Sequence, residues 1–269
     1  KINLSHKLND DVLFYATYSE GFRPSGTNRL NKQARESGIV PATYDSDTLT
    51  NLEAGFKSTF ADGKIVLNGN LHTMNWDDFQ STSYIYDLLT VAFVQNVGQA
   101  TITGLELESY FNISDTFSAS LMLALTDPEF KEDIYDLQGE LSTPKGNQLA
   151  YVPTEQFVMS MNKDFVIRNR DAYVSYDHSY TGESYQSSAN TDTNASYSLA
   201  NLRFGVNPSS KASSQADDIF GFLKHSSVEV YLENVHDSDP TLGIYDDFGD
   251  IRRTGSKPRT IGVRLRYRF

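Results

Sequence analysis

The chain has 269 residues, a net charge of −12 and no cysteine. The lack of cysteine excludes disulfides, thiolate metal sites and cysteine nucleophiles, and the acidic balance argues against nucleic acid as a partner. No run of about 18 apolar residues is present, so a transmembrane helix is excluded, whereas a membrane β-strand needs only about 9–11 alternating residues.

Alternation of apolar and polar residues is the dominant pattern, and no amphipathic helix of useful length interrupts it. Side chains of a strand point to opposite faces with a period of two, so each alternating run predicts one strand with two different faces. The runs predict eleven strands, near residues 2–7, 12–22, 52–60, 65–79, 105–111, 117–125, 157–162, 172–180, 201–206, 228–233 and 261–269.

Two details refine the predicted strands. The sequence Asp62-Gly63 lies in the short connection 61–64, where it supplies the positive φ angles that a tight hairpin requires. The alternation changes phase near Met74–Trp76, which predicts a bulge or an aromatic girdle position.

The connections alternate in length. Short turns are predicted near 9–11, 61–64, 113–116 and 166–170, and long polar loops near 23–47, 80–99, 128–155, 181–196 and 236–257. This layout is typical of an outer-membrane barrel with short periplasmic turns and long extracellular loops. A soluble sandwich also gives alternating strands, but the strands here exceed its usual five or six residues. Segment 207–226 is an exception, because it is long where a short turn is expected.

Six segments resemble the C-terminal half of the TonB-dependent outer-membrane receptors. They are FYATYSEGFRPSGTNR at 14–29, LEAGFKS at 52–58, NWDDFQ at 75–80, NVGQATITGLELE at 96–108, LENV at 232–235 and PRTIGVRLRYRF at 258–269. The resemblance implies an all-β fold, an antiparallel transmembrane β-barrel of 22 strands around a plug. Residues 1–269 would form about 11 of those strands, and the N-terminal plug domain and first barrel strands would be absent from this chain.

The resemblance also implies a function. The expected activity is energised uptake of a scarce nutrient across the outer membrane of a Gram-negative bacterium, with a ferric siderophore as the default cargo. Carbohydrate or cobalamin uptake, or a passive porin-like barrel, are the alternatives. Expected partners are outer-membrane lipid and lipopolysaccharide, the TonB complex, the small-molecule cargo and the barrel-assembly machinery. Tyr267 and Phe269 resemble the C-terminal signal that this machinery recognises. Gly262 departs from the usual spacing of that signal, because it lies two places earlier than is common.

No catalytic or metal-binding constellation is found, so neither an enzyme nor a cofactor is predicted. The five histidines are scattered along the chain. Charges on the last two strands predict a network on the lumen wall, in which Glu229 lies near Arg266 or Arg268 and which also includes Glu233 and Arg264. A rigid wall is favoured over a substrate path, because polar lumen faces are general in such barrels.

Cargo binding is predicted in the long loops and the upper wall. Aromatic side chains offer stacking faces, and arginine binds carboxylates or phosphates, although loop packing or an aromatic girdle explains each tyrosine equally well. The last loop is also acidic, for which solvated charge is favoured over a Ca²⁺ site. The candidates are Arg23, Asn28, Arg29, Tyr84, Tyr86, Tyr180, Tyr185, Tyr245, Asp246, Asp247, Arg252 and Arg253.

Overall fold

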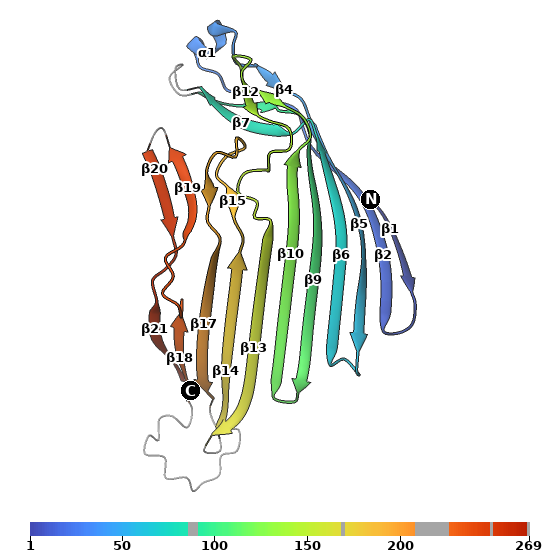
Figure 1. Cartoon of the computed structure of the whole chain (residues 1–269), viewed down its shortest axis with the longest axis vertical. Coiled ribbons are helices and arrows are strands. Elements are labelled where there is room, and N and C mark those ends of the chain that lie inside the picture. The colour runs from blue at the N-terminus through green and yellow to red at the C-terminus, as the bar shows by residue number, and fades with distance from the viewer. Residues whose placement is uncertain (86–90, 168–169, 208–225, 248–249, 268–269) are drawn as a thin grey trace.

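The structure is a computed structural model that describes residues 1–85, 91–167, 170–207, 226–247 and 250–267. These residues form one 11-stranded antiparallel sheet, in which each long strand pairs with the long strands before and after it in the chain (Figure 1). The prediction of an all-β antiparallel fold is therefore confirmed. The strands of the sheet are β1 (Ile2–Lys7), β2 (Val12–Arg23), β5 (Asp47–Phe60), β6 (Ile65–Asp77), β9 (Ala100–Ser114), β10 (Phe117–Phe130), β13 (Glu155–Ile167), β14 (Arg170–Thr181), β17 (Tyr197–Val206), β18 (Ser226–Glu233) and β21 (Thr260–Tyr267).

The sheet has one apolar face and one polar face. The strand register aligns Val230 with Val263 and Leu232 with Ile261, and it aligns Glu229 with Arg264 on the opposite face. Val263 is 68% exposed and Ile261 is 74% exposed. Large apolar side chains exposed side by side on a sheet face are typical of a surface that contacts lipid or another protein, because their exposure to water is costly.

The turns and loops fall at opposite ends of the strands (Figure 1). In the turn 61–64, Asp62 and Gly63 adopt the positive φ angles predicted for them, and Ala61 does so as well. The structure describes no helix that is long and apolar enough to cross a membrane. The exceptional segment 207–226 lies largely outside the described residues, since 208–225 are not among them.

The predicted change of phase near Met74–Trp76 is wrong. Strand β6 pairs without a register shift with both neighbours, with Trp76 opposite Leu49 on β5 and Ala100 on β9. Regular alternation therefore places Trp76 on the polar face, where it is neither a bulge residue nor part of a girdle facing lipid.

The long loops contain short elements of their own. These are β3 (Gly26–Thr27), α1 (Lys32–Ser37), β4 (Thr43–Tyr44), β7 (Gln80–Ile85), β8 (Val91–Asn96), β11 (Ile134–Tyr135), β12 (Leu141–Thr143), β15 (Ser184–Tyr185), β16 (Thr193–Asn194), β19 (Thr241–Asp247) and β20 (Asp250–Gly255). Residues of the first three long loops form two small apolar clusters.

The first cluster contains residues from the first, second and third long loops. Ala34 of α1 packs with Val40, Val91 and Phe93, and Leu137 of the third loop packs against them. The second cluster lies where the polar face meets the loops, and it is formed by Ala100, Phe130, Ile134 and Leu149 with Trp76, Phe79, Val97, Ile102 and Val152.

Candidate functional site

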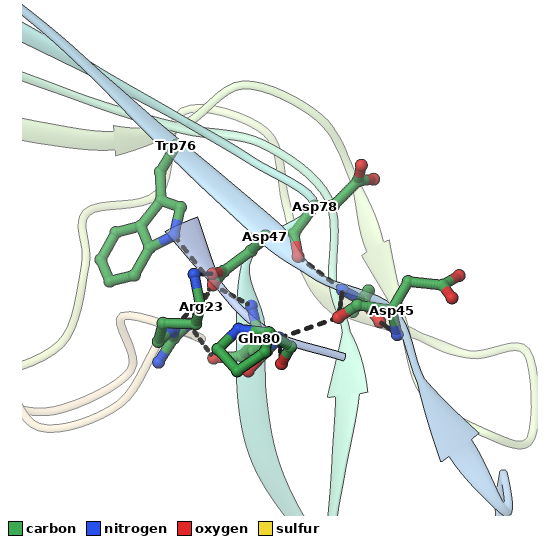
Figure 2. A network of polar contacts seen from close by, with 8 residues as sticks. Arg23, Asp45, Asp47, Trp76, Asp78 and Gln80 are labelled. Carbon is green, nitrogen blue, oxygen red and sulfur yellow. Dashed lines mark hydrogen bonds and ion pairs between the residues drawn. The ribbon is translucent and has the colours of Figure 1, made fainter. Parts of the chain in front are cut away.

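Asp47 is the centre of a polar network at the loop end of the polar face (Figure 2). It is 1% exposed, and its carboxylate forms an ion pair with the Arg23 guanidinium. The Trp76 indole N–H donates to Asp47 Oδ2 at 2.9 Å, and the backbone N–H of Gln80 donates to it at 3.1 Å. Such charge-assisted bonds compensate for the loss of water around the buried carboxylate.

The same network joins the first two long loops at their bases. The Gln80 amide donates to the carbonyl oxygens of Pro24 at 3.1 Å and Asp45 at 2.8 Å. The Asn96 amide donates to the carbonyl oxygens of Asp45 at 3.1 Å and Asp78 at 2.7 Å. The Arg23 guanidinium also lies over the Trp76 ring, 4.9 Å from its centroid. Both loop bases are therefore held in one arrangement, with Arg23, 47% exposed, at its surface.

Asn28 forms a second connection between these loops. Its amide donates to the carbonyl oxygens of Pro41 at 2.9 Å and Val94 at 2.8 Å, and its side-chain oxygen accepts the Val94 N–H at 2.8 Å. The structure therefore uses this predicted cargo-binding residue to fasten one loop to the other.

Tyr151 connects the third, fourth and fifth long loops. Its backbone N–H donates to the Tyr185 carbonyl at 2.8 Å, and its hydroxyl donates to the Ile244 carbonyl at 2.9 Å. Its φ of 61° lies in the left-handed region that a tyrosine rarely occupies, so the surrounding hydrogen bonds compensate for the strain. Tyr185, another predicted binding residue, is half-buried beside it.

The predicted charge network on β18 and β21 forms with a different register. We predicted Arg266 or Arg268 as the partner of Glu229, but Arg264 lies directly opposite and forms the ion pair, and Arg266 lies opposite Ser227. The Tyr173 hydroxyl donates a further hydrogen bond to Glu229. The predicted partner of Glu229 was therefore wrong by at least two residues along β21. The register of the two strands depends on the connection between them, which the sequence alone does not determine.

Replacing Glu229 with glutamine is expected to lower the free energy of unfolding by about 1 kcal/mol, because the Arg264 ion pair is lost while the Tyr173 bond is retained. Arg264 is 49% exposed, so solvent screening limits the effect. Urea unfolding of the full-length protein in detergent measures it. Glu233→Gln is the control, since Glu233 lies opposite Thr260 and has no ion pair with a described residue. Equal losses in both variants would contradict the assigned pair.

Charges elsewhere on the polar face follow two patterns. Near the C-terminal end, Asp177 pairs with Arg203 at 2.6 Å. On β5 and β9, the carboxylates instead accept from neutral groups. Tyr15 donates to Glu53 at 2.6 Å, Asn70 donates to Glu106 at 2.9 Å and Asn68 donates to Glu108 at 3.1 Å. The polar face is therefore acidic on these strands.

Tyr180 lies on the apolar face, away from the predicted cargo-binding surface. It is aligned with Phe157, their ring centroids are 6.0 Å apart, and its hydroxyl donates to Glu155 at 2.9 Å. We therefore omit it from the proposed binding residues.

Among the remaining candidates, the strand register aligns Tyr245 of β19 with Arg252 of β20. Arg29 and Tyr84 are exposed on the first two loops, Arg252 is exposed on β20, and Arg253 lies 3.7 Å from Asp239. Tyr86, Arg268 and Phe269 lie outside the described residues, as do the side chains of Tyr245, Asp246 and Asp247. Tyr267 is opposite Ser226 and is 49% exposed.

Sequence reasoning missed Asp47 and Trp76 as parts of the site. An aspartate at the first position of a strand, on the face that also carries Glu53, was the available signal. Among the described residues, no three histidine, aspartate or glutamate side chains gather into a metal site.

Comparison with known proteins explains this architecture. Residues 1–235 match the family model described as TonB dependent receptor-like, beta-barrel. The chain belongs to the TonB-dependent receptor family. The prediction made from the six sequence segments is thereby confirmed.

Solved structures of uptake receptors and of a transporter are similar over nearly the whole chain. The ferric yersiniabactin uptake receptor FyuA from Yersinia pestis is 20% identical with a TM-score of 0.74, over 99% of this chain and 36% of its own. The siderophore receptor PiuA from Acinetobacter baumannii is 17% identical with a TM-score of 0.73, over 98% of this chain and 34% of its own. The copper transporter OprC is 14% identical with a TM-score of 0.67, over 99% of this chain and 38% of its own. The chain thus spans about a third of the length of these proteins.

Proposed function

We propose that the chain forms part of an outer-membrane transporter that takes up a ferric siderophore with energy delivered by TonB. The observation that carries this proposal is the fold similarity to two siderophore receptors over 98–99% of the chain, together with the family match. Since the chain corresponds to about a third of each receptor, the activity belongs to a longer protein that also has a plug and further strands.

The two faces of the sheet support a membrane location. In this proposal the apolar face meets lipid in the outer membrane of a Gram-negative bacterium, and the polar face lines the lumen. The long loops then lie outside the cell with outer-leaflet lipopolysaccharide around them, and the short turns lie in the periplasm. Tyr267 and Phe269 would serve as the signal for the barrel-assembly machinery.

The polar face also suits contact with a plug. Its carboxylates Glu53, Glu106 and Glu108 accept hydrogen bonds from neutral side chains and therefore retain net negative charge. A basic plug surface would complement them. Cargo would bind above, where the exposed candidates on the loops are Arg23, Arg29, Tyr84, Arg252 and Arg253, with half-buried Tyr185 behind them.

One alternative cargo has a specific observation in its favour. The fold is similar to that of a copper transporter as well as to those of siderophore receptors. A ferric chelate remains the better proposal, because the two structures with the higher TM-scores are siderophore receptors.

The test uses the full-length gene in cells grown under iron limitation. We expect accumulation of ⁵⁵Fe from at least one of a panel of ferric siderophores, and loss of that uptake when either this gene or the TonB gene is deleted. Uptake that persists without TonB would identify a passive barrel. Uptake of copper, carbohydrate or cobalamin in place of every ferric chelate would overturn the siderophore assignment.

A further inference from the structure

The hairpin formed by β11 and β12 is fixed to the rest of the protein at two points. Ile134 packs into the cluster that includes Ala100 and Phe130, on the polar face of the sheet. Leu137, at the tip of the hairpin, packs against the cluster of α1 and the β7–β8 hairpin. The third long loop therefore packs against the polar face of the sheet, at the end of the strands where the long loops lie.

The hairpin is also rigid in itself. Asp136 Oδ1 accepts the backbone N–H groups of Gln138 and Glu140, each at 2.9 Å. Asp133 accepts the N–H of Lys145 at 2.8 Å, which closes the base of the loop. A side chain on this hairpin consequently has a defined position, which is a requirement for a selective contact.

The two cross-strand pairs of the hairpin lie on two different faces. Ile134 and Thr143 are aligned and are 9% and 5% exposed, because their face packs against the wall. Tyr135 and Leu141 are aligned with one another, and they are 55% and 50% exposed. Tyr135 follows Ile134 directly and therefore points away from the wall, and Leu141 shares its face as its cross-strand partner. Leu141 and Thr143 lie on different faces although they are two residues apart, because the register shifts between the two pairs.

This aligned pair exposes an aromatic ring and a branched aliphatic side chain at the loop end of the sheet. The surrounding segment 131–145 contains four acidic residues and two lysines, so its net charge is negative. A carboxylate group would be repelled there, whereas an uncharged ring would bury apolar area against both side chains and stack on the tyrosine.

We propose that Tyr135 and Leu141 form a contact surface for an uncharged, ring-bearing part of the ferric chelate. This inference rests on the proposed function, and it names the part of the cargo that the third loop selects. It also assigns a binding role to two residues that lie outside the predicted set.

The experiment uses the full-length receptor in cells and in detergent. The probes are a ferric trihydroxamate that carries an uncharged phenyl ring and the same ferric trihydroxamate with an aliphatic group in place of the ring. We expect wild-type receptor to bind the ring-bearing probe, Tyr135→Ala and Leu141→Ala each to weaken that binding ~10-fold, and Tyr135→Phe to stay within ~2-fold of wild type.

Tyr110→Ala is the matched control, because Tyr110 is 42% exposed on β9 and aligns with Ser120 near the short turn 113–116, at the end of the strands opposite to the loops. We expect this variant to bind as wild type does. Surface labelling and resistance to protease verify that every variant reaches the membrane folded.

The outcomes separate this inference from the proposed function. If ferric chelates are taken up through TonB but Tyr135→Ala binds the ring-bearing probe unchanged, the inference is wrong and the function stands. Equal weakening by Tyr110→Ala would likewise overturn it. Wild-type receptor that binds neither probe, or only the aliphatic one, would also refute the selection of a ring-bearing cargo, whereas failure of all TonB-dependent iron uptake would refute the function.

Discussion

Replacing Val263 with arginine is expected to destabilise the folded barrel by about 2–4 kcal/mol. Val263 lies on the apolar face opposite Val230, with 68% of its side chain exposed. If that face meets the hydrocarbon region, the guanidinium must leave water for lipid, and the cost is largest near the middle of the bilayer. The measurement is reversible urea unfolding of the full-length protein in lipid vesicles.

Val158→Arg is the matched control for this prediction. Val158 is 43% exposed and is aligned with Met122 on the polar face, so the same substitution places the charge on the side proposed to line the lumen. We expect a change below about 1 kcal/mol, because the cation stays hydrated there. Similar losses in the two variants would show that the faces are assigned wrongly.

Replacing Asp47 with asparagine is expected to release the bases of the first two long loops. The substitution removes the charge that holds Arg23 and weakens the bonds from Trp76 and Gln80 to a site that is 1% exposed. We expect local opening to become easier by about 2 kcal/mol, since bonds to a buried charge are worth more than neutral ones. Hydrogen–deuterium exchange of segments 24–46 and 78–99 should then accelerate roughly 30-fold.

Asp45→Asn provides the comparison. Asp45 is exposed two residues away, and it takes part in the network through its backbone carbonyl and N–H, which the substitution preserves. Its exchange should match that of wild type. Unchanged exchange in Asp47→Asn would mean that the loops are held by their apolar cluster alone.

Most of the sheet could be predicted from the sequence because each strand separates its apolar and polar side chains. Val263 and Arg264 differ so clearly that one residue pair assigns both faces of β21. The turn at Asp62-Gly63 could also be predicted from the sequence, because few residues adopt positive φ without strain. These features depend on neighbours in the sequence, and local rules describe them well.

The candidate site was predicted less well, because its contacts join residues far apart in the chain. Arg23 was identified from its chemistry, yet its partner Asp47 and its stacking ring Trp76 belong to separate strands. Tyr180 ends the strand predicted at 172–180, but the tyrosine-rich pattern there does not alternate clearly, so its face could not be assigned from the sequence. Loop packing such as that of Ile134 and Leu137 is set by three-dimensional neighbours, so no periodic pattern indicates it.

The strictly sequential pairing of the long strands has a consequence for how such walls change in evolution. Each hairpin borders only the hairpins before and after it, so duplicating or deleting one leaves every other strand pairing intact. The circumference of a wall built this way therefore changes in steps of two strands. Gene duplication of a single hairpin is enough to widen it, and no existing connection has to be rerouted.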